Sequence, residues 1–204
     1  MADLLRNALR ASYASVAWGA AAGVAEIVVG ARSASLALAG VGATVLVDLI
    51  SSVVLVWRFR AELHHESDLH LAAERRAQRV ASLCLSVIGV CLAIGAIARL
   101  VVGGGAHSDP AAVVLAAVSV PVLAGLARWK YLAARGVASK ALRTDAHISL
   151  LGAGTSALTL VGLALSSGAD VTWADSVAAL VVGLLAIREG WRGSHASSGE
   201  VEDL

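Results

Sequence analysis

A few polar side chains interrupt the long apolar runs of this 204-residue sequence, and their chemistry is the natural starting point. Asp48 lies in the middle of one run, and Thr44 precedes it by one helical turn on the same face. Asp145 and Ser149 stand four residues apart near the start of another run, so they share a face as well. An ionisable group near the centre of a bilayer costs roughly 2.5–3.5 kcal/mol on insertion scales, so it needs a partner, a proton or a cation. We therefore take Thr44, Asp48, Asp145 and Ser149 as candidate metal-binding residues.

Each of the two acids also has a structural interpretation. Asp48 could be protonated and hydrogen-bonded to a neighbouring helix. Asp145 could be an acid of the first helical turn, stabilised by the helix dipole. His147 lies about 200° around the helix from Asp145, so one helix cannot direct both side chains at one ion.

Two further polar groupings attract attention. Glu26 and Arg99 fall at similar expected depths near the outer boundary, which predicts a buried ion pair between them. A polar segment after the second run could collect a divalent metal, but it lacks an HExxH or CxxC pattern, and a solvated loop is the favoured interpretation. Its imidazoles and carboxylates belong to His64, His65, Glu66, Asp68 and His70.

The composition indicates a membrane protein. Apolar residues make up 58% of the chain and charged residues 15%, whereas soluble domains average roughly 45–50% and about 25%. The mean hydropathy is +0.78. The formal net charge is only +1, and the basic residues form no single patch, so nucleic-acid binding has no electrostatic support. Cys84 and Cys91 lie in one apolar run, where we expect them to be buried as small hydrophobes rather than paired.

Six apolar runs are long enough to cross a bilayer as helices, for which about 20 residues are needed. They are residues 11–31, 35–57, 80–102, 111–127, 144–166 and 173–191. We therefore predict an all-α membrane protein whose six transmembrane helices occupy residues 11–193. The flanking segments, residues 1–10 and 194–204, are predicted to be a cytoplasmic N-terminus and a disordered cytoplasmic tail.

The basic residues predict the orientation. Of the 16 Lys and Arg residues, all but Arg32 and Arg99 fall on one side of the six spans, with Lys130 assigned to the loop after the fourth span. The positive-inside rule then places both termini in the cytoplasm. No loop is large enough for a soluble catalytic domain, and no nucleophile–base pair is visible, so we expect no enzymatic activity and no cofactor.

Three stretches resemble the transmembrane domain of the cation diffusion facilitator (cation efflux) family. The stretch SASLALAGVGATVLVDLISSVVLVWRF is similar to the family's second span, with its SxSLAL opening, mid-span acid and following Ser-Ser. The stretch ASKALRTDAHISLLGAGTSALTLVGLAL resembles the fifth span, in which Asp145 matches the acid of an L-R-A-D-A segment. TWADSVAALVVGLLAIREGWR resembles the sixth. The likeness is greatest to a short branch that includes actinobacterial cation-transporter-like proteins and a synaptic-vesicle zinc-binding membrane protein.

The resemblance implies a metal site at the bilayer midplane with two ligands from span two and two from span five, each pair spaced i,i+4. The corresponding positions here are Thr44, Asp48, Ile148 and Gly152, of which only Asp48 is a strong ligand. The implied function is transport of a divalent cation, zinc by default, in exchange for protons, by a homodimer with a degenerate metal site. The alternative is a transport-inactive subunit that keeps the fold and dimerises with, or regulates, an intact relative. The excess of Arg over Lys suggests a GC-rich genome and hence a bacterial plasma membrane.

Overall fold

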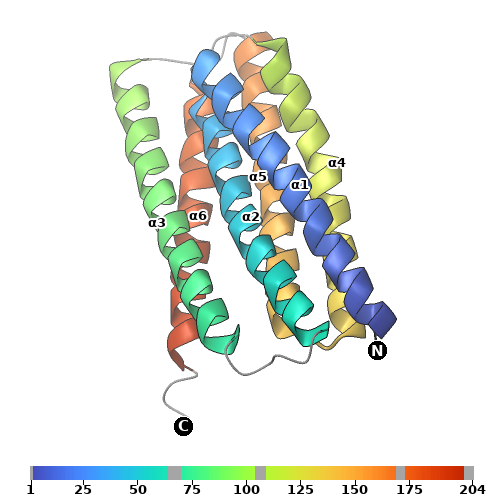
Figure 1. The fold of residues 1–204 in the computed structure, drawn as a ribbon. Coiled ribbons are helices and arrows are strands. Elements are labelled where there is room, and N and C mark those ends of the chain that lie inside the picture. The colour runs from blue at the N-terminus through green and yellow to red at the C-terminus, as the bar shows by residue number, and fades with distance from the viewer. Residues whose placement is uncertain (1, 64–69, 104–108, 169–172, 200–204) are drawn as a thin grey trace.

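The described part of the chain forms a bundle of six antiparallel helices in a computed structural model (Figure 1). The structure describes residues 2–63, 70–103, 109–168 and 173–199. The start of α1 and the end of α6 lie at the same end of the bundle (Figure 1). The helices are α1 (Ala2–Arg32), α2 (Leu36–Leu63), α3 (His70–Val102), α4 (Pro110–Gly136), α5 (Lys140–Gly168) and α6 (Ala174–Gly199).

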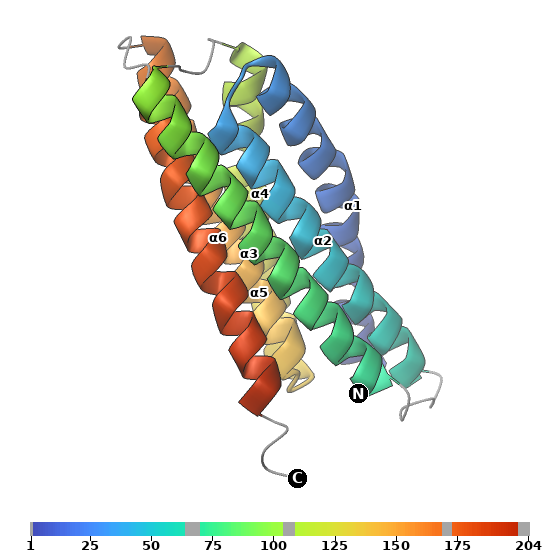
Figure 2. The same ribbon diagram turned by 90° about the vertical axis from the view of Figure 1, so that its left-hand side faces the viewer.

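Helix α2, which carries Asp48, is the central element of the bundle. The most extensive packing joins α1 to α2, α3 to α6 and α4 to α5, and α2 also contacts α3, α5 and α6. Figure 2 shows the α3–α6 pair from the side, with α2 next to α3. Residues on α2 can therefore meet residues from most of the other helices.

Glycines allow two of these helix pairs to approach closely. A Cβ added at Gly42 of α2 would lie 2.7 Å from the carbonyl oxygen of Gly23 of α1, and one added at Gly89 of α3 would lie 2.6 Å from that of Gly183 of α6. Such distances leave no room for a side chain. Without a hydrophobic driving force inside lipid, close backbone packing of this kind is what associates helices.

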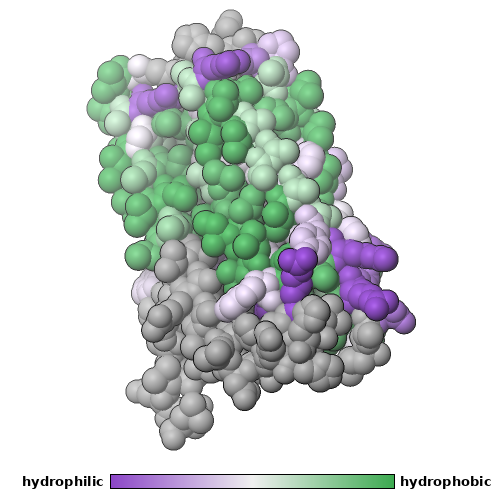
Figure 3. All heavy atoms as spheres, viewed as in Figure 1, coloured by the Kyte–Doolittle hydropathy of each residue, from purple (hydrophilic) through white to green (hydrophobic). Residues whose placement is uncertain are grey.

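The outer surface fits a lipid environment. Five of the helices, α1 to α5, contain segments long and apolar enough to cross a membrane by length and composition. Apolar residues form a broad band around the middle of the face seen in Figure 3, and hydrophilic residues gather towards its ends.

The expected burial of the cysteines is wrong: the two thiols are free, but Cys84 is half-buried and Cys91 is exposed on α3. In a bilayer an apolar thiol can face lipid at little cost, so its apolarity does not predict burial in the bundle.

The helices are longer than the apolar runs that predicted them. Helix α1 begins at Ala2, within the expected cytoplasmic segment, and α6 ends at Gly199, within the expected tail. Helix α4 continues to Gly136, nine residues past the predicted end of its span at residue 127. Hydropathy reports the part of a helix that is apolar all round, whereas the backbone can remain helical beyond it. The polar segment for which a solvated loop was favoured over a metal site falls mostly on residues 64–69, which lie outside the described residues, and the structure does not describe the His70 side chain.

Candidate metal and proton site

A buried lysine stands at the centre of the predicted site. The Lys130 ammonium on α4 lies 2.7 Å from Asp145 Oδ2 on α5 and 3.4 Å from Asp48 Oδ1 on α2. It also donates to Ser149 Oγ at 2.8 Å and to Ser52 Oγ at 3.1 Å. The Lys130 side chain is fully buried, and both carboxylates are almost completely so. Three helices thus converge on one enclosed positive charge.

The sequence analysis assigned Lys130 to a cytoplasmic loop, and this assignment is wrong. Lys130 lies inside α4, on the buried stripe of that helix, in phase with its apolar residues. The stripe comprises Leu123, Leu126, Ala127, Lys130, Ala133 and Ala134. A hydropathy profile treats a lysine next to Arg128 as the end of a span. The 3.6-residue period of the surrounding apolar residues was the signal that could have placed it in the core.

The geometry separates the roles of the two carboxylates. An ammonium has three protons, and its three nearest acceptors are Asp145, Ser149 and Ser52. Asp48 is held chiefly through a bridging hydroxyl, because Ser149 Oγ contacts Lys130 and also lies 3.1 and 3.2 Å from the two Asp48 oxygens. Asp145 is therefore the direct partner of Lys130. Its alternative interpretation as a first-turn acid is wrong, because α5 begins at Lys140 and has no acidic residue in its first turn. Asp48 is the more loosely held carboxylate.

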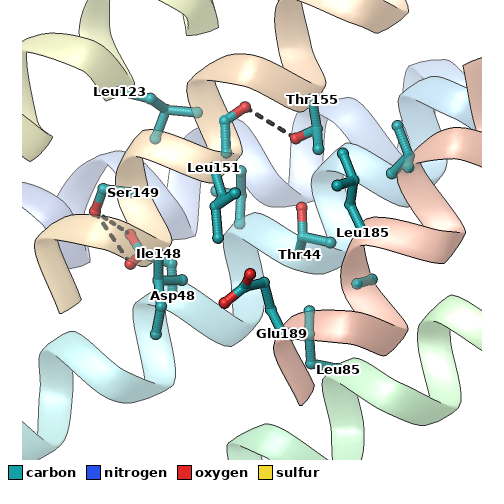
Figure 4. Close-up of a pocket in the computed structure, with 14 residues that line it drawn as sticks. Thr44, Asp48, Leu85, Leu123, Ile148, Ser149, Leu151, Thr155, Leu185 and Glu189 are labelled. Carbon is teal, nitrogen blue, oxygen red and sulfur yellow. Dashed lines mark hydrogen bonds between the residues drawn. The ribbon is translucent and has the colours of Figure 1, made fainter. Parts of the chain in front are cut away.

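Asp48 also borders a cavity of about 40 Å³, which Ser149 lines as well. The cavity lies between α2, α5 and α6, and α3 and α4 complete its wall with Leu85 and Leu123 (Figure 4). A water molecule needs roughly 10–15 Å³ measured in the same way, so the space suffices for a small ion with a water. All four positions implied by the resemblance line it, namely Thr44, Asp48, Ile148 and Gly152.

The side-chain atoms around the cavity that could bind a cation are all oxygens. Ser149 and Thr155 of α5 contribute hydroxyl groups, but the Thr155 hydroxyl donates to the Gly152 carbonyl at 3.0 Å. The Thr44 hydroxyl donates to the Val41 carbonyl at 2.8 Å, which leaves its lone pairs for a cation. Across the cavity from α2, α6 presents Glu189 (Figure 4). The sequence analysis missed Glu189, although its i,i+3 and i,i+7 spacing from Ala186 and Val182 puts it on the same stripe.

The structure thus brings together three of the four predicted metal-binding residues and places the fourth nearby. Asp48, Asp145 and Ser149 meet around Lys130, while Thr44 lies beside Asp48 at the cavity. His147 is exposed, as its position on the far face of α5 predicted. Within the part of the chain that the structure describes, no three His, Cys, Asp or Glu side chains are grouped closely enough to hold a metal ion. A cation at Asp48 would therefore depend on hydroxyls and on Glu189.

The predicted ion pair between Glu26 and Arg99 is wrong. Glu26 is fully buried on α1 and accepts a hydrogen bond from Ser119 of α4. Arg99, in the last turn of α3, donates to the carbonyl oxygen of Ala34. Equal depth in the membrane did not make these residues neighbours, because α1 packs on α2 and α4 and not extensively on α3.

A six-helix, membrane-spanning bundle with charged residues enclosed at its centre defines an integral membrane protein of the kind that handles ions, since such residues mark ion and proton pathways. Residues 12–197 match the model of the cation efflux transmembrane domain. This chain belongs to that family, whose members are cation transporters of the cation diffusion facilitator type. No curated protein matches the chain.

Proposed function

We propose that this protein transports a divalent cation, zinc or a similar ion, through the cavity beside Asp48, in exchange for protons. One observation carries the proposal: the cavity touches the four positions that correspond to the family's ligand pattern, and one of them is a carboxylate. The space lies between α2, α5 and α6, so a small rocking of these helices would open it to either side of the membrane.

The ligands proposed for the cation are oxygens from α2, α5 and α6. Asp48 supplies the principal carboxylate, with Glu189 opposite and the hydroxyls of Thr44 and Ser149 beside it. Zinc accepts carboxylate oxygens but prefers nitrogen and sulfur donors. An all-oxygen set suits Mn²⁺ or Mg²⁺ equally well. Manganese and magnesium therefore belong in any test of substrate.

Exchange with protons follows from the position of Asp48 at the cavity. Ser149 and Lys130 hold the carboxylate, and Asp48 also lines the cavity. A carboxylate must lose its proton before it binds a metal ion, so loading the cavity releases a proton and unloading takes one up. The Lys130–Asp145 pair keeps the surrounding framework in place during this exchange.

A second function is favoured by a specific observation. The ammonium of Lys130 already provides a positive charge 3.4 Å from Asp48, where a transported cation would otherwise be needed. Ile148 and Gly152, at two of the four ligand positions, offer no donor. These features suit a transport-inactive subunit that keeps the fold and pairs with an intact relative in the same plasma membrane.

Uptake into proteoliposomes separates the two functions. We expect the wild type to move at least one of Zn²⁺, Mn²⁺ and Mg²⁺, faster with a pH gradient than without it. Asp48→Asn should lower the rate at least about tenfold, a change of about 1.4 kcal/mol. The control Asp3→Asn makes the same change at a carboxylate that is 98% exposed, and it should transport normally.

If the wild type moves none of the three ions, the transport-inactive subunit is the better account. If Asp48→Asn transports as well as the wild type, the cavity is not the pathway.

A further inference from the structure

A second buried carboxyl group lies outside the Asp48 cavity. Glu26 of α1 is fully buried, and its Oε1 accepts a hydrogen bond from Ser119 Oγ of α4. Its other oxygen, Oε2, is buried without a hydrogen-bond partner. The helix packs tightly at this point, since a Cβ added at Gly42 of α2 would lie 2.9 Å from Glu26 Cβ. The carboxyl group is thus enclosed between α1, α2 and α4.

The surroundings of this carboxyl group are apolar on both sides. Along α4, Ser119 lies between Ala116 and Leu123, which belong to two separate apolar clusters. The first contains Leu38 and Leu163, and the second contains Val41 and Val45. An isolated carboxylate in such a medium is very unfavourable, and in practice the group becomes neutral instead.

No cation of the described residues neutralises Glu26. Helices α2 and α4 are the elements packed against α1. On α2 the nearest titratable group to Gly42 is Asp48, itself an acid, six residues and about 9 Å further along the axis.

On α4 the titratable groups nearest to Ser119 are Arg128 and Asp109, about 14 and 15 Å away along the axis. On α1 itself the nearest are Arg32, about 9 Å along the axis, and Tyr13, about 20 Å. Lys130, further along α4 than Arg128, is bonded to Asp145.

We propose that Glu26, held by Ser119 between α1 and α4, is a proton-binding site of the bundle, separate from the Asp48 cavity. Its ligand is a proton, bound as the neutral carboxylic acid, with the carbonyl oxygen accepting from Ser119 and the hydroxyl on Oε2. A neutral acid explains how one buried oxygen can lack a partner, because an unpaired hydroxyl costs far less than an unpaired charge. Separation of α1 from α4 would admit water and allow the proton to leave.

Whether Glu26 binds a proton does not depend on the proposed function. A role for that proton in transport does rest on the proposed function. If the protein exchanges a cation for protons, Glu26 supplies a second proton-binding carboxyl group in addition to Asp48. The two sites lie on opposite sides of α2, one towards α1 and α4 and the other towards α5 and α6. Both can therefore respond to movement of this one central helix.

Infrared spectroscopy of the full chain in lipid at neutral pH tests the occupancy directly. A protonated carboxyl group gives a carbonyl stretching band that a carboxylate lacks. We expect such a band in the wild type and its loss in Glu26→Gln. In Ser119→Ala the band should persist but move to higher frequency, because the carbonyl loses its hydrogen-bond donor. The other buried acids of the described residues are Asp48, Asp145 and Asp175, the last of which is on α6 and accepts from Ser35. Asp48→Asn, Asp145→Asn and Asp175→Asn identify any bands from them.

The contradicting result is a spectrum in which neither Glu26→Gln nor Ser119→Ala changes any protonated-carboxyl band. Glu26 would then be ionised and the proposal wrong. Ser119→Ala retains the carboxyl group and removes only its hydrogen-bond donor, so it provides the test even if Glu26→Gln folds poorly.

A role of Glu26 in transport is tested by uptake. Glu26→Gln should remove the acceleration of uptake by a pH gradient while leaving ion binding unchanged. Unchanged acceleration by the gradient would overturn the coupling role alone, and a wild type that transports no ion would overturn the proposed function while leaving the spectroscopic result valid.

Discussion

Two of the buried carboxyl sites among the described residues are neutralised in different ways. Asp48 and Asp145 meet the ammonium of Lys130, which lies 2.7 Å from Asp145 and 3.4 Å from Asp48. Glu26 has a hydroxyl partner, Ser119, and no counter-charge among the described residues. The first site therefore combines a charge pair, Lys130 with Asp145, with an acid, Asp48, that exchanges a proton for a cation in the proposed function, whereas the second depends on a bound proton alone. The difference shows that an acid within an apolar run does not by itself reveal which ion it binds, since a neighbouring helix can already provide the cation, as α4 does with Lys130.

Removing Lys130 should produce the largest loss of stability. Lys130→Met keeps an unbranched side chain but leaves two buried carboxylates unpaired. Breaking a buried pair in this way costs about 3–5 kcal/mol, which we expect to see in denaturant unfolding in detergent. The control Arg6→Met removes an exposed surface pair and should change stability by less than about 1 kcal/mol.

A second substitution sharpens that result. Adding Asp145→Asn to Lys130→Met removes one of the unpaired charges, so the double variant should be more stable than Lys130→Met alone. Equal stability of Lys130→Met and the wild type would mean that the ammonium does not neutralise the site.

Rebuilding the family's ligand set should convert the cavity into a tight zinc site. The triple variant Thr44→Asp, Ile148→His and Gly152→Asp would place strong ligands at all four positions, of which Asp48 is now the only strong ligand. We expect zinc affinity to rise at least about 100-fold, or about 2.7 kcal/mol, in equilibrium binding. A Cβ at Gly152 would lie 3.3 Å from Leu123 Cδ1, so Leu123→Ala should be added to make room. A variant that folds but binds zinc no better than the wild type would show that α2 and α5 do not present these positions to one ion.

The smallest expected effect concerns Glu26 and Arg99. Because Glu26 bonds to Ser119 and Arg99 to Ala34, the two have no shared partner. The stability losses of Glu26→Gln and Arg99→Gln should therefore add within about 0.5 kcal/mol in the double variant. A double variant that loses less stability than the sum of the two single losses would support the ion pair that the sequence suggested.

The sequence predicts the six helices, because apolar runs of about the length of a membrane span recur along it, and α1 to α5 contain segments long and apolar enough to cross a bilayer. It also identifies Asp48, Asp145 and Ser149, whose spacing puts each on a core-facing stripe. Lys130 and Glu189 escape prediction for one physical reason: each lies close to an arginine at the end of an apolar run, where hydropathy places the membrane boundary. The partner of Glu26 escapes prediction because depth along a helix does not reveal which helices are neighbours.

The central claim, that a cation passes through the cavity beside Asp48, is tested most directly by filling that cavity. Gly152 lines it, whereas Gly154, two residues along the same helix, is exposed, and a Cβ there would have no atom within 4 Å. The rates of cation uptake by Gly152→Leu and Gly154→Leu are therefore the measurement, with both variants reconstituted to equal density. We predict at least about a tenfold loss for Gly152→Leu and wild-type transport for Gly154→Leu. Wild-type transport by a folded Gly152→Leu protein would contradict the account.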